Sequence, residues 1–275
     1  MLGTGVSYAY APCQNCDSRV LLDIPSELAP FYPPTYGSFV SSFGRFARQR
    51  ARWLSDDKWS AVRRVGADRS ARVLDVGCGA GAFLRMLEVK GFRNLAGVDP
   101  FMPAEQSDAR GPIRLRQGDV GVFAQEKFDL ITMHHVVEHA PDPVALLNSA
   151  GQMLSRGGMI LVRTPIVDSW ASVTYGPNWV QHDAPRHLVI LSSRGAEAAA
   201  AAAGLRILDS WRDEGRWAAW ASTMLAAGRD PFRAPPWRIR IGGFRHARAA
   251  QRRNRRGEGD SACFVLGRAL DSPAS

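Results

Sequence analysis

Three closely spaced glycines lie between two acidic residues, a combination typical of a turn that holds a nucleotide. Gly77, Gly79 and Gly81 follow a short apolar run, where the chain must turn sharply and let a ligand approach its backbone. Asp75 precedes the glycines, and a carboxylate there would repel a pyrophosphate and suit a cation. Asp99 follows Gly77 by 22 residues, where an acid is placed to hold ribose hydroxyls. The spacing predicts a nucleotide-type site that favours a cationic ligand.

A second group of reactive residues comes after the fourth expected strand. It contains His134, His135, Glu138 and His139, and imidazole is suited to accept a proton near neutral pH. The stretch from His135 to His139 also matches the His-x-x-Glu-His pattern of inverted zinc peptidases. That chemistry needs a long helix and a distant third ligand, whereas here a strand precedes and two prolines follow almost at once. A magnesium role for Glu138 and His139 is a further alternative, but oxygen ligands are few and we expect no metal site.

A third group gathers aromatic and polar residues in a loop after the fifth expected strand. Convergent polar groups among aromatic rings are typical of ligand pockets. We expect Trp179, His182 and Arg186 to contact a substrate, and we expect either His187 or His139 to accept a proton. The alternative is an ordered loop whose rings merely pack and whose arginine pairs with a carboxylate.

A regular alternation of strands and helices would position these groups. Loops at the carboxyl ends of parallel strands carry the active sites of such folds. Strands separated by helices indicate an α/β protein with a mostly parallel sheet and helices on both faces. The expected strands are 73–76, 95–98, 113–117, 128–133, 159–162, 205–208 and 262–266.

Together these motifs resemble the core of class I S-adenosylmethionine-dependent methyltransferases. The Trp…Pro-Arg-His-Leu loop is similar to that of the small-molecule branch, and the resemblance implies a Rossmann-like, seven-stranded sheet. It also implies S-adenosylmethionine as the cofactor, with Glu138 among the substrate contacts. For Asp119, which would bind the adenine amino group, a simple loop cap is the alternative. The implied cofactor contacts are Asp75, Gly77, Cys78, Gly79, Gly81, Asp99, Pro100, Asp119, Val120 and His134.

The function implied by this resemblance is methyl transfer to a small or lipid- or sugar-linked acceptor. The methylated atom would be a hydroxyl oxygen, an amine nitrogen or a carbon. The main alternative is a methyltransferase that acts on nucleic acid and docks through an arginine-rich segment. A protein that only binds the cofactor is disfavoured by the three intact acids, Asp75, Asp99 and Asp119. The glycine spacing and the acid before it disfavour a nicotinamide oxidoreductase.

The charge of the chain is concentrated near its end. The net charge is +9 over 275 residues, and the segment 231–257 contains nine arginines and no acid. Such a run suits nucleic acid or an anionic membrane surface, but we favour a solvated segment without a specific partner. We expect a cytoplasmic protein, because no stretch could span a membrane, no secretory signal is evident, and the four cysteines are unevenly placed.

The chain divides into a core with two additions. We expect an N-terminal extension or cap over 1–70, a methyltransferase core over 71–211 and 258–275, and an insertion over 212–257. Within the extension, aromatic residues of the segment 39–53 recur as in a helix, which we expect to pack over the cofactor pocket. Cys13 and Cys16 have the spacing of half a zinc site, but no second pair follows them.

Overall fold

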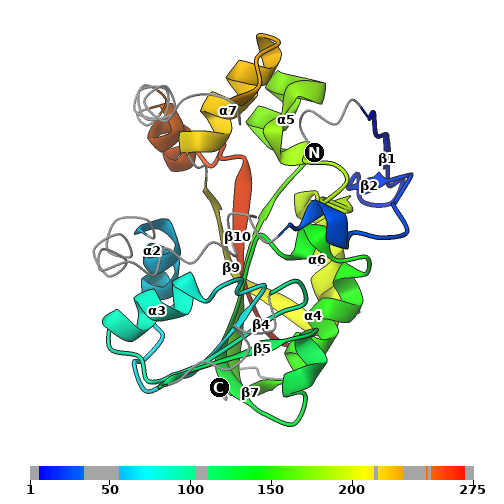
Figure 1. Ribbon diagram of the computed structural model, residues 1–275. Helices are drawn as coiled ribbons and strands as arrows, with labels where there is room; N and C mark the ends of the chain where they lie inside the picture. Colours follow the sequence, from blue (N-terminus) through cyan, green and yellow to red (C-terminus); the bar gives the residue numbers. More distant parts are fainter. Residues whose placement is uncertain are drawn as a thin grey trace.

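A seven-stranded sheet lies at the centre of the molecule (Figure 1). The computed structural model describes residues 6–33, 56–102, 111–213, 216–231, 246 and 249–269. The strands of the sheet span Arg72–Val76 (β3), Asn94–Asp99 (β4), Ile113–Gln117 (β5), Phe128–His134 (β6), Leu154–Pro165 (β7), Leu205–Asp213 (β9) and Ser261–Arg268 (β10). Their order is β5-β4-β3-β6-β7-β10-β9, and only β10 runs antiparallel to its neighbours. The predicted mostly parallel, Rossmann-like sheet is confirmed.

Helices cover both faces of this sheet. Two lie on one face and two on the other (Figure 1), and each pair packs into its own hydrophobic core. The first pair is α2 (Asp56–Arg64) and α3 (Ala82–Val89), and the second is α4 (Pro143–Gln152) and α6 (Ser193–Ala202).

Side-chain caps fix where the second pair of helices begins. Asp142 accepts a hydrogen bond from the N–H of Ala145 at 2.9 Å, directly before the proline that opens α4. Ser192 accepts one from the N–H of Gly195 at 2.8 Å and caps α6. Both helices therefore start where their sequence signals predict.

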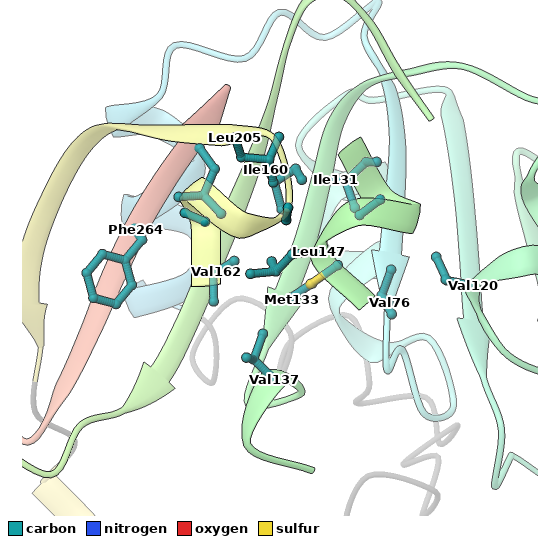
Figure 2. Packing of buried hydrophobic residues seen from close by; sticks show 14 of the residues in the cluster. Val76, Val120, Ile131, Met133, Val137, Leu147, Ile160, Val162, Leu205 and Phe264 are labelled. Atoms are coloured by element: carbon teal, nitrogen blue, oxygen red, sulfur yellow. The ribbon is translucent and has the colours of Figure 1, made fainter. Parts of the chain in front are cut away.

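The two cores hold the strand ends in fixed positions. Figure 2 shows the core beneath α4 and α6, where Met133 of β6 lies in the same cluster as Leu147 of α4. On the other face, Leu84 of α3 and Val62 of α2 are equally buried. Burying one such side chain contributes about 1.5–3 kcal/mol, so many of them make the carboxyl edge of the sheet a rigid support.

The strands that pair with β10 are longer than the sequence predicted. β7 covers Leu154–Pro165 instead of 159–162, and β9 covers Leu205–Asp213 instead of 205–208. Both pair with β10 along almost its whole length, and a β-bulge near Val265 adjusts the register with β9. Strand length here is set by these partners rather than by the local apolar run. β9 thus continues into the segment 212–257.

A small second sheet, which the sequence did not predict, holds the N-terminal segment. It consists of β1 (Tyr10–Pro12), β2 (Arg19–Leu21) and β8 (Val189–Ile190), all antiparallel. Cys13 and Cys16 lie in the turn between β1 and β2, and the hydroxyl of Ser18 in this hairpin accepts from the N–H of Ser192 at 3.0 Å. Strands of two and three residues give no periodic signal, so only the fold reveals this sheet.

Further helical elements complete the part of the chain that the structure describes. The helix predicted within 39–53 and most of the basic run 231–257 lie outside that part. No described helix is both long and apolar enough to cross a membrane. The remaining elements are η1 (Ala29–Phe31), η3 (Val120–Phe123), η4 (Val137–His139), α5 (Trp170–Tyr175), η5 (Gly176–Asn178), η6 (Val180–His182), α7 (Arg216–Ala226) and a helical stretch over 249–255.

Candidate active site

The glycine turn lies at the carboxyl end of β3 and is held by backbone hydrogen bonds. Gly77 and Cys78 donate their N–H groups to the carbonyl oxygen of Val98, at 2.8 Å and 3.1 Å. Gly77 has a φ of +70°, and a Cβ there would lie 2.5 Å from Cγ2 of Val136. The position therefore requires glycine, since the turn packs directly against the histidine-containing segment.

Asp99 ends β4, and its carboxylate connects the turn to the next loop. Its Oδ2 accepts from the N–H of Gly79 at 3.0 Å, and its Oδ1 accepts from that of Phe101 at 2.9 Å. Burial raises the pKa of the Asp99 carboxyl, although these hydrogen bonds oppose the shift. These hydrogen bonds do not use all the lone pairs of a carboxylate, so Asp99 keeps the capacity to accept from ribose hydroxyls.

Three other predicted cofactor contacts near the turn differ in their surroundings. The side chain of Cys78 is buried in the core, where its Sγ would lie 2.8 Å from a Cβ placed on Gly97. Contact of Cys78 with a ligand is thus limited to its backbone. Gly81 adopts a left-handed φ of +76° immediately before α3, and Pro100 is exposed.

Asp75 faces a lysine that the sequence reasoning missed. Asp75 is 3% exposed and accepts from the hydroxyl of Thr132 at 2.7 Å. Burial raises its pKa to about 6, while the positive charge of Lys58 on α2 opposes the shift. One acidic and one basic group at this end of the turn are complementary to the amino-acid end of S-adenosylmethionine. Lysine is rare in this arginine-rich chain, and that rarity is the signal that could have marked Lys58.

His134 is buried beside this pair. Among the described residues, neither of its ring nitrogens has a hydrogen-bond partner, and its edge contacts the ring of Phe83 at a centroid distance of 4.8 Å. Burial and the nearby charge of Lys58 hold the pKa of His134 well below its usual value. Buried polar groups normally have partners, so two orphaned nitrogens fit a place where a polar ligand binds.

Asp119 and Val120 lie at the end of β5. The Asp119 carboxylate accepts from the N–H of Gly121 at 2.8 Å and caps η3. This contact is the loop cap that we considered as the alternative to adenine binding. Val120 is 8% exposed and belongs to the core on the α4 face. Their roles toward adenine stay predictions.

Glu138 is a fully buried carboxylate with two specific partners. Its Oε1 lies 2.9 Å from Nδ1 of His135, and its Oε2 accepts from the hydroxyl of Thr164 at 2.9 Å. Burial alone would raise the pKa of Glu138, but the hydrogen bond with His135 and the neighbouring histidines lower it to about 2. His135 adopts a left-handed φ of +58°, which is uncommon for a residue with a side chain.

The structure brings the two predicted base candidates together. The rings of His139 and His187 are 4.7 Å apart between centroids. Nδ1 of His139 lies 2.9 Å from the carbonyl oxygen of Arg186, and Nδ1 of His187 lies 2.6 Å from that of Gln181. Burial, followed by the charge of His187, lowers the pKa of His139 to about 4. His139 therefore stays neutral at physiological pH.

The predicted substrate residues of the loop make mostly internal contacts. Arg186 pairs with Asp183 at 2.6 Å, and Trp179 is 1% exposed. Trp179 and His182 also line a cavity of about 540 Å³, to which Tyr10 contributes. The arginine pairing and the buried tryptophan agree with the packing alternative, and substrate contact by these residues stays a prediction.

Tyr32 connects the two halves of the site and was not predicted to do so. Its ring stacks on Phe101 at a centroid distance of 4.2 Å and an interplanar angle of 5°. Its hydroxyl lies 2.9 Å from Nδ1 of His139. The segment around Tyr32 thus lies against both the loop after Asp99 and the histidine pair.

Comparison with known proteins places this geometry in a family. A family model for the methyltransferase domain matches residues 45–210. A tRNA U34 carboxymethyltransferase of Sulfurimonas denitrificans is 25% identical over 185 residues, which cover 64% of this chain and 58% of that protein. A ubiquinone biosynthesis O-methyltransferase of Azorhizobium caulinodans is 32% identical over 142 residues, covering 46% and 56%. The chain spans little more than half the length of these two relatives.

Solved structures support the same fold. An S-adenosylmethionine-dependent methyltransferase from Thermotoga maritima superposes with a TM-score of 0.51, covering 81% of this chain and 91% of that one. The sequence identity is 18%, so the likeness concerns the fold. One of the two relatives above is named for tRNA and the other for ubiquinone biosynthesis, so the comparisons leave the acceptor of this chain open.

Proposed function

The chain belongs to the family of S-adenosylmethionine-dependent methyltransferases, and we propose that it methylates a small or lipid- or sugar-linked acceptor at a hydroxyl, amine or carbon. The observation that carries the proposal is Tyr32, which stacks on Phe101 and contacts His139. Through this residue, the edge that carries Asp99 and the histidine pair form one continuous wall. A methyl donor and a proton acceptor would then face the same space.

The chain's own residues have two tasks in this reaction. S-adenosylmethionine supplies an activated methyl group, which moves to the acceptor in an in-line displacement. The protein must align donor and acceptor, and orientation of this kind accounts for much of the acceleration in such reactions. Asp75 and Lys58 would hold the amino-acid end of the donor, and Asp99 its ribose.

The second task is to receive the acceptor's proton, which we assign to His187. His139 is a weak base because its pKa is lowered to about 4. The Nε2 of His187 lies 3.9 Å from a carboxylate oxygen of Asp183, and the ionised Glu138 is also near. Both negative charges would stabilise the imidazolium that forms when His187 takes a proton. His139 would then act by positioning the acceptor.

Cofactor and acceptor can be tested separately. Calorimetry should detect binding of S-adenosylhomocysteine and no binding of a nicotinamide dinucleotide; the reverse result would contradict the proposed chemistry. A panel of sugar, quinone-like and RNA acceptors, assayed for S-adenosylhomocysteine as product, then identifies the acceptor class. Turnover of sugar or quinone-like compounds supports the proposal, and turnover of RNA alone contradicts the small-acceptor part.

An RNA acceptor is the second candidate, because part of the basic segment lies beside the exposed ring of Trp170. The guanidinium of Arg253 lies 4.4 Å from the ring centroid of Trp170, and Arg252, Arg255 and Arg256 are exposed. The likeness to tRNA U34 carboxymethyltransferases points the same way. Binding through phosphates would weaken steeply as salt is raised from 50 to 200 mM, whereas a small acceptor would bind with little salt dependence.

The thiols support a reducing compartment, and we propose the cytoplasm. Among the described residues, Cys13, Cys16, Cys78 and Cys263 form no disulfide bond. Cys78 and Cys263 are buried in the core, where oxidants have little access.

A further inference from the structure

We propose that Glu138, His139 and His187 bind one divalent metal ion of the zinc class. One ligand atom from each of the three lies within 4.8 Å of the other two. Among the described residues, this is the one cluster of histidine, cysteine and acidic side chains that could hold an ion. The sequence offered a magnesium role for Glu138 and His139 as an alternative, but it did not indicate His187 as a third ligand, because His187 belongs to a loop far from the other two residues. The inference goes beyond methyl transfer and does not depend on which acceptor is used.

The hydrogen bonds of the two histidines occupy Nδ1 and leave Nε2 of each ring available to a metal ion. A carbonyl oxygen can only accept, so the Nδ1 atoms bonded to Arg186 O and Gln181 O carry the protons. Nε2 of His139 and Nε2 of His187 therefore carry the lone pairs. Histidines that bind metals usually have this arrangement, in which one nitrogen donates to a carbonyl or carboxylate and the other binds the ion.

The carboxylate is held in the same way. His135 and Thr164 each contact one oxygen of Glu138, which fixes its orientation without using all of its lone pairs. A fully buried anion is also costly unless a positive charge lies near it. A bound cation would supply that charge directly.

The ligand set and the spacing indicate the kind of ion. Zinc binds nitrogen and oxygen at about 2.0–2.2 Å, so ligand atoms around it are at most about 4 Å apart. A cluster within 4.8 Å needs only small side-chain shifts to close around an ion. Two imidazoles and one carboxylate suit Zn²⁺, Co²⁺ or Fe²⁺ better than Mg²⁺ or Ca²⁺, which prefer oxygen. Three protein ligands also leave a position open, as in catalytic zinc sites.

An ion in this position would change how the acceptor is activated. A hydroxyl oxygen bound to the ion would lose its proton more easily, and because both imidazoles are then ligands, the proton would pass to solvent water instead of to His187. Metal binding can be measured without any turnover. If the protein bound metal but methylated no acceptor, the proposed function would be refuted and the inferred metal site would still stand.

The test is a titration of the full chain, first treated with a chelator, with Co²⁺ and Zn²⁺. We expect one equivalent to bind and the cobalt form to show visible bands typical of nitrogen and oxygen ligands. Glu138→Gln keeps the size of the side chain and should weaken binding by at least about 10- to 100-fold, the loss that even outer-shell changes cause. Unchanged affinity for S-adenosylhomocysteine in this variant would show that its fold is intact.

Two controls separate this site from other ligands. His246→Gln removes a histidine outside the cluster, and the double variant Cys13→Ser/Cys16→Ser removes the rival pair; both should bind one equivalent with unchanged affinity. The inference is overturned if the wild type binds no ion, if Glu138→Gln binds normally, or if the cysteine variant loses binding. Should Glu138→Gln fail to fold, X-ray absorption of the zinc-loaded wild type decides. Nitrogen and oxygen at about 2.0–2.2 Å support the site, and sulfur at about 2.3 Å refutes it.

Discussion

The proposed cofactor side and the proposed acceptor side of the site are built in different ways. Most of the cofactor side comes from one continuous strand–turn–helix–strand unit, to which α2 adds Lys58, and backbone N–H groups make its defining bonds to Val98 and Asp99. The acceptor side joins side chains from distant segments: Tyr32 and His139 are 107 positions apart. A site made from backbone leaves a continuous motif in the sequence. A site made from side chains of several segments becomes visible only after folding.

The two sides also treat a buried carboxylate in opposite ways. The pKa of Asp75 is raised to about 6 by burial, whereas that of Glu138 is lowered to about 2 despite burial. Asp75 has one hydrogen-bond donor and a lysine nearby, while Glu138 contacts His135 and Thr164 and lies among further histidines. Hydrogen bonds and positive charges outweigh the effect of desolvation on the pKa only for Glu138. Glu138 is thus ionised near neutral pH, whereas the charged form of Asp75 is stabilised most when a ligand brings a cation next to it.

The largest expected effect comes from a change on the acceptor side, which should reduce turnover and leave cofactor binding unchanged. His187→Ala should lower kcat by about 10²- to 10⁴-fold, the usual contribution of a general acid or base. Affinity for S-adenosylhomocysteine, measured by calorimetry, should stay unchanged, because His187 makes none of the contacts of the glycine turn. His246→Ala, outside the site, serves as the control. Wild-type turnover in His187→Ala would remove this residue from the mechanism.

The matching change on the cofactor side should have the opposite result, with weaker cofactor binding and little change in kcat. Asp99→Asn replaces a charged acceptor by a neutral one and should weaken S-adenosylhomocysteine binding by about 10- to 100-fold, since hydrogen bonds to charged groups contribute about 1.5–3 kcal/mol. At saturating cofactor, kcat should change little. Asp129→Asn removes a carboxylate at the opposite edge of the sheet, where it accepts from the N–H of Arg72, and should leave affinity intact. Equal losses in both variants would argue against a role specific to Asp99.

A third experiment tests the contrast between the two carboxylates with pH. Below about pH 6, Asp75 takes up a proton and loses its attraction for the ammonium group of the ligand. Affinity for S-adenosylhomocysteine should therefore fall by up to about tenfold per pH unit, because one proton is involved. Glu138 stays ionised in this range, so the histidine cluster keeps its negative charge. For the ligand-free protein the sign is opposite: Asp75 contributes less stability as pH rises from about 4 to about 6.

Asp75→Asn is the control for this pH dependence. Its affinity should be lower at neutral pH and flat between about pH 4 and about pH 6. Lys58, His134 and Asp99 also influence this end of the site. A slope that persists in Asp75→Asn would assign the effect to Asp99, whose pKa burial also raises.

The contrast explains what the sequence could predict. The strands around the glycine turn are predicted well because β3 and β4 are short, buried and bounded by local turn signals. The predicted lengths of β7 and β9 were wrong, because pairing with β10 determines how far these strands extend. The three-stranded sheet was not predicted, because strands of two or three residues are too short to show a periodic hydrophobic pattern.

The candidate site divides in the same way. The sequence placed Asp75, the glycines and Asp99 at one edge, since all of them lie at or just after the carboxyl ends of two strands of a parallel sheet. It could not show that His187 lies beside His139, because the loop's path depends on the β8 pairing and on the bond from the N–H of Leu188 to the carbonyl oxygen of Glu138, at 2.7 Å. Lys58 was missed because a lone lysine on a helix is ordinarily a solvated residue.

The smallest expected effect concerns Tyr32, where the two sides meet. Tyr32→Phe keeps the ring that stacks on Phe101 and removes only the hydroxyl near His139. Losing one neutral hydrogen bond costs about 0.5–1.5 kcal/mol, so kcat should fall by about 2- to 10-fold with cofactor affinity unchanged.

Tyr32→Ala also removes the stacked ring and should weaken S-adenosylhomocysteine binding as well. Tyr175→Phe, which removes a hydroxyl 3.0 Å from that of Thr223, is the matched control and should change neither quantity. If Tyr32→Phe reduced affinity and spared kcat, the hydroxyl would belong to the cofactor side. The boundary between the cofactor side and the acceptor side would then lie between Tyr32 and His139. The histidine pair would have to orient the acceptor without the help of the Tyr32 hydroxyl.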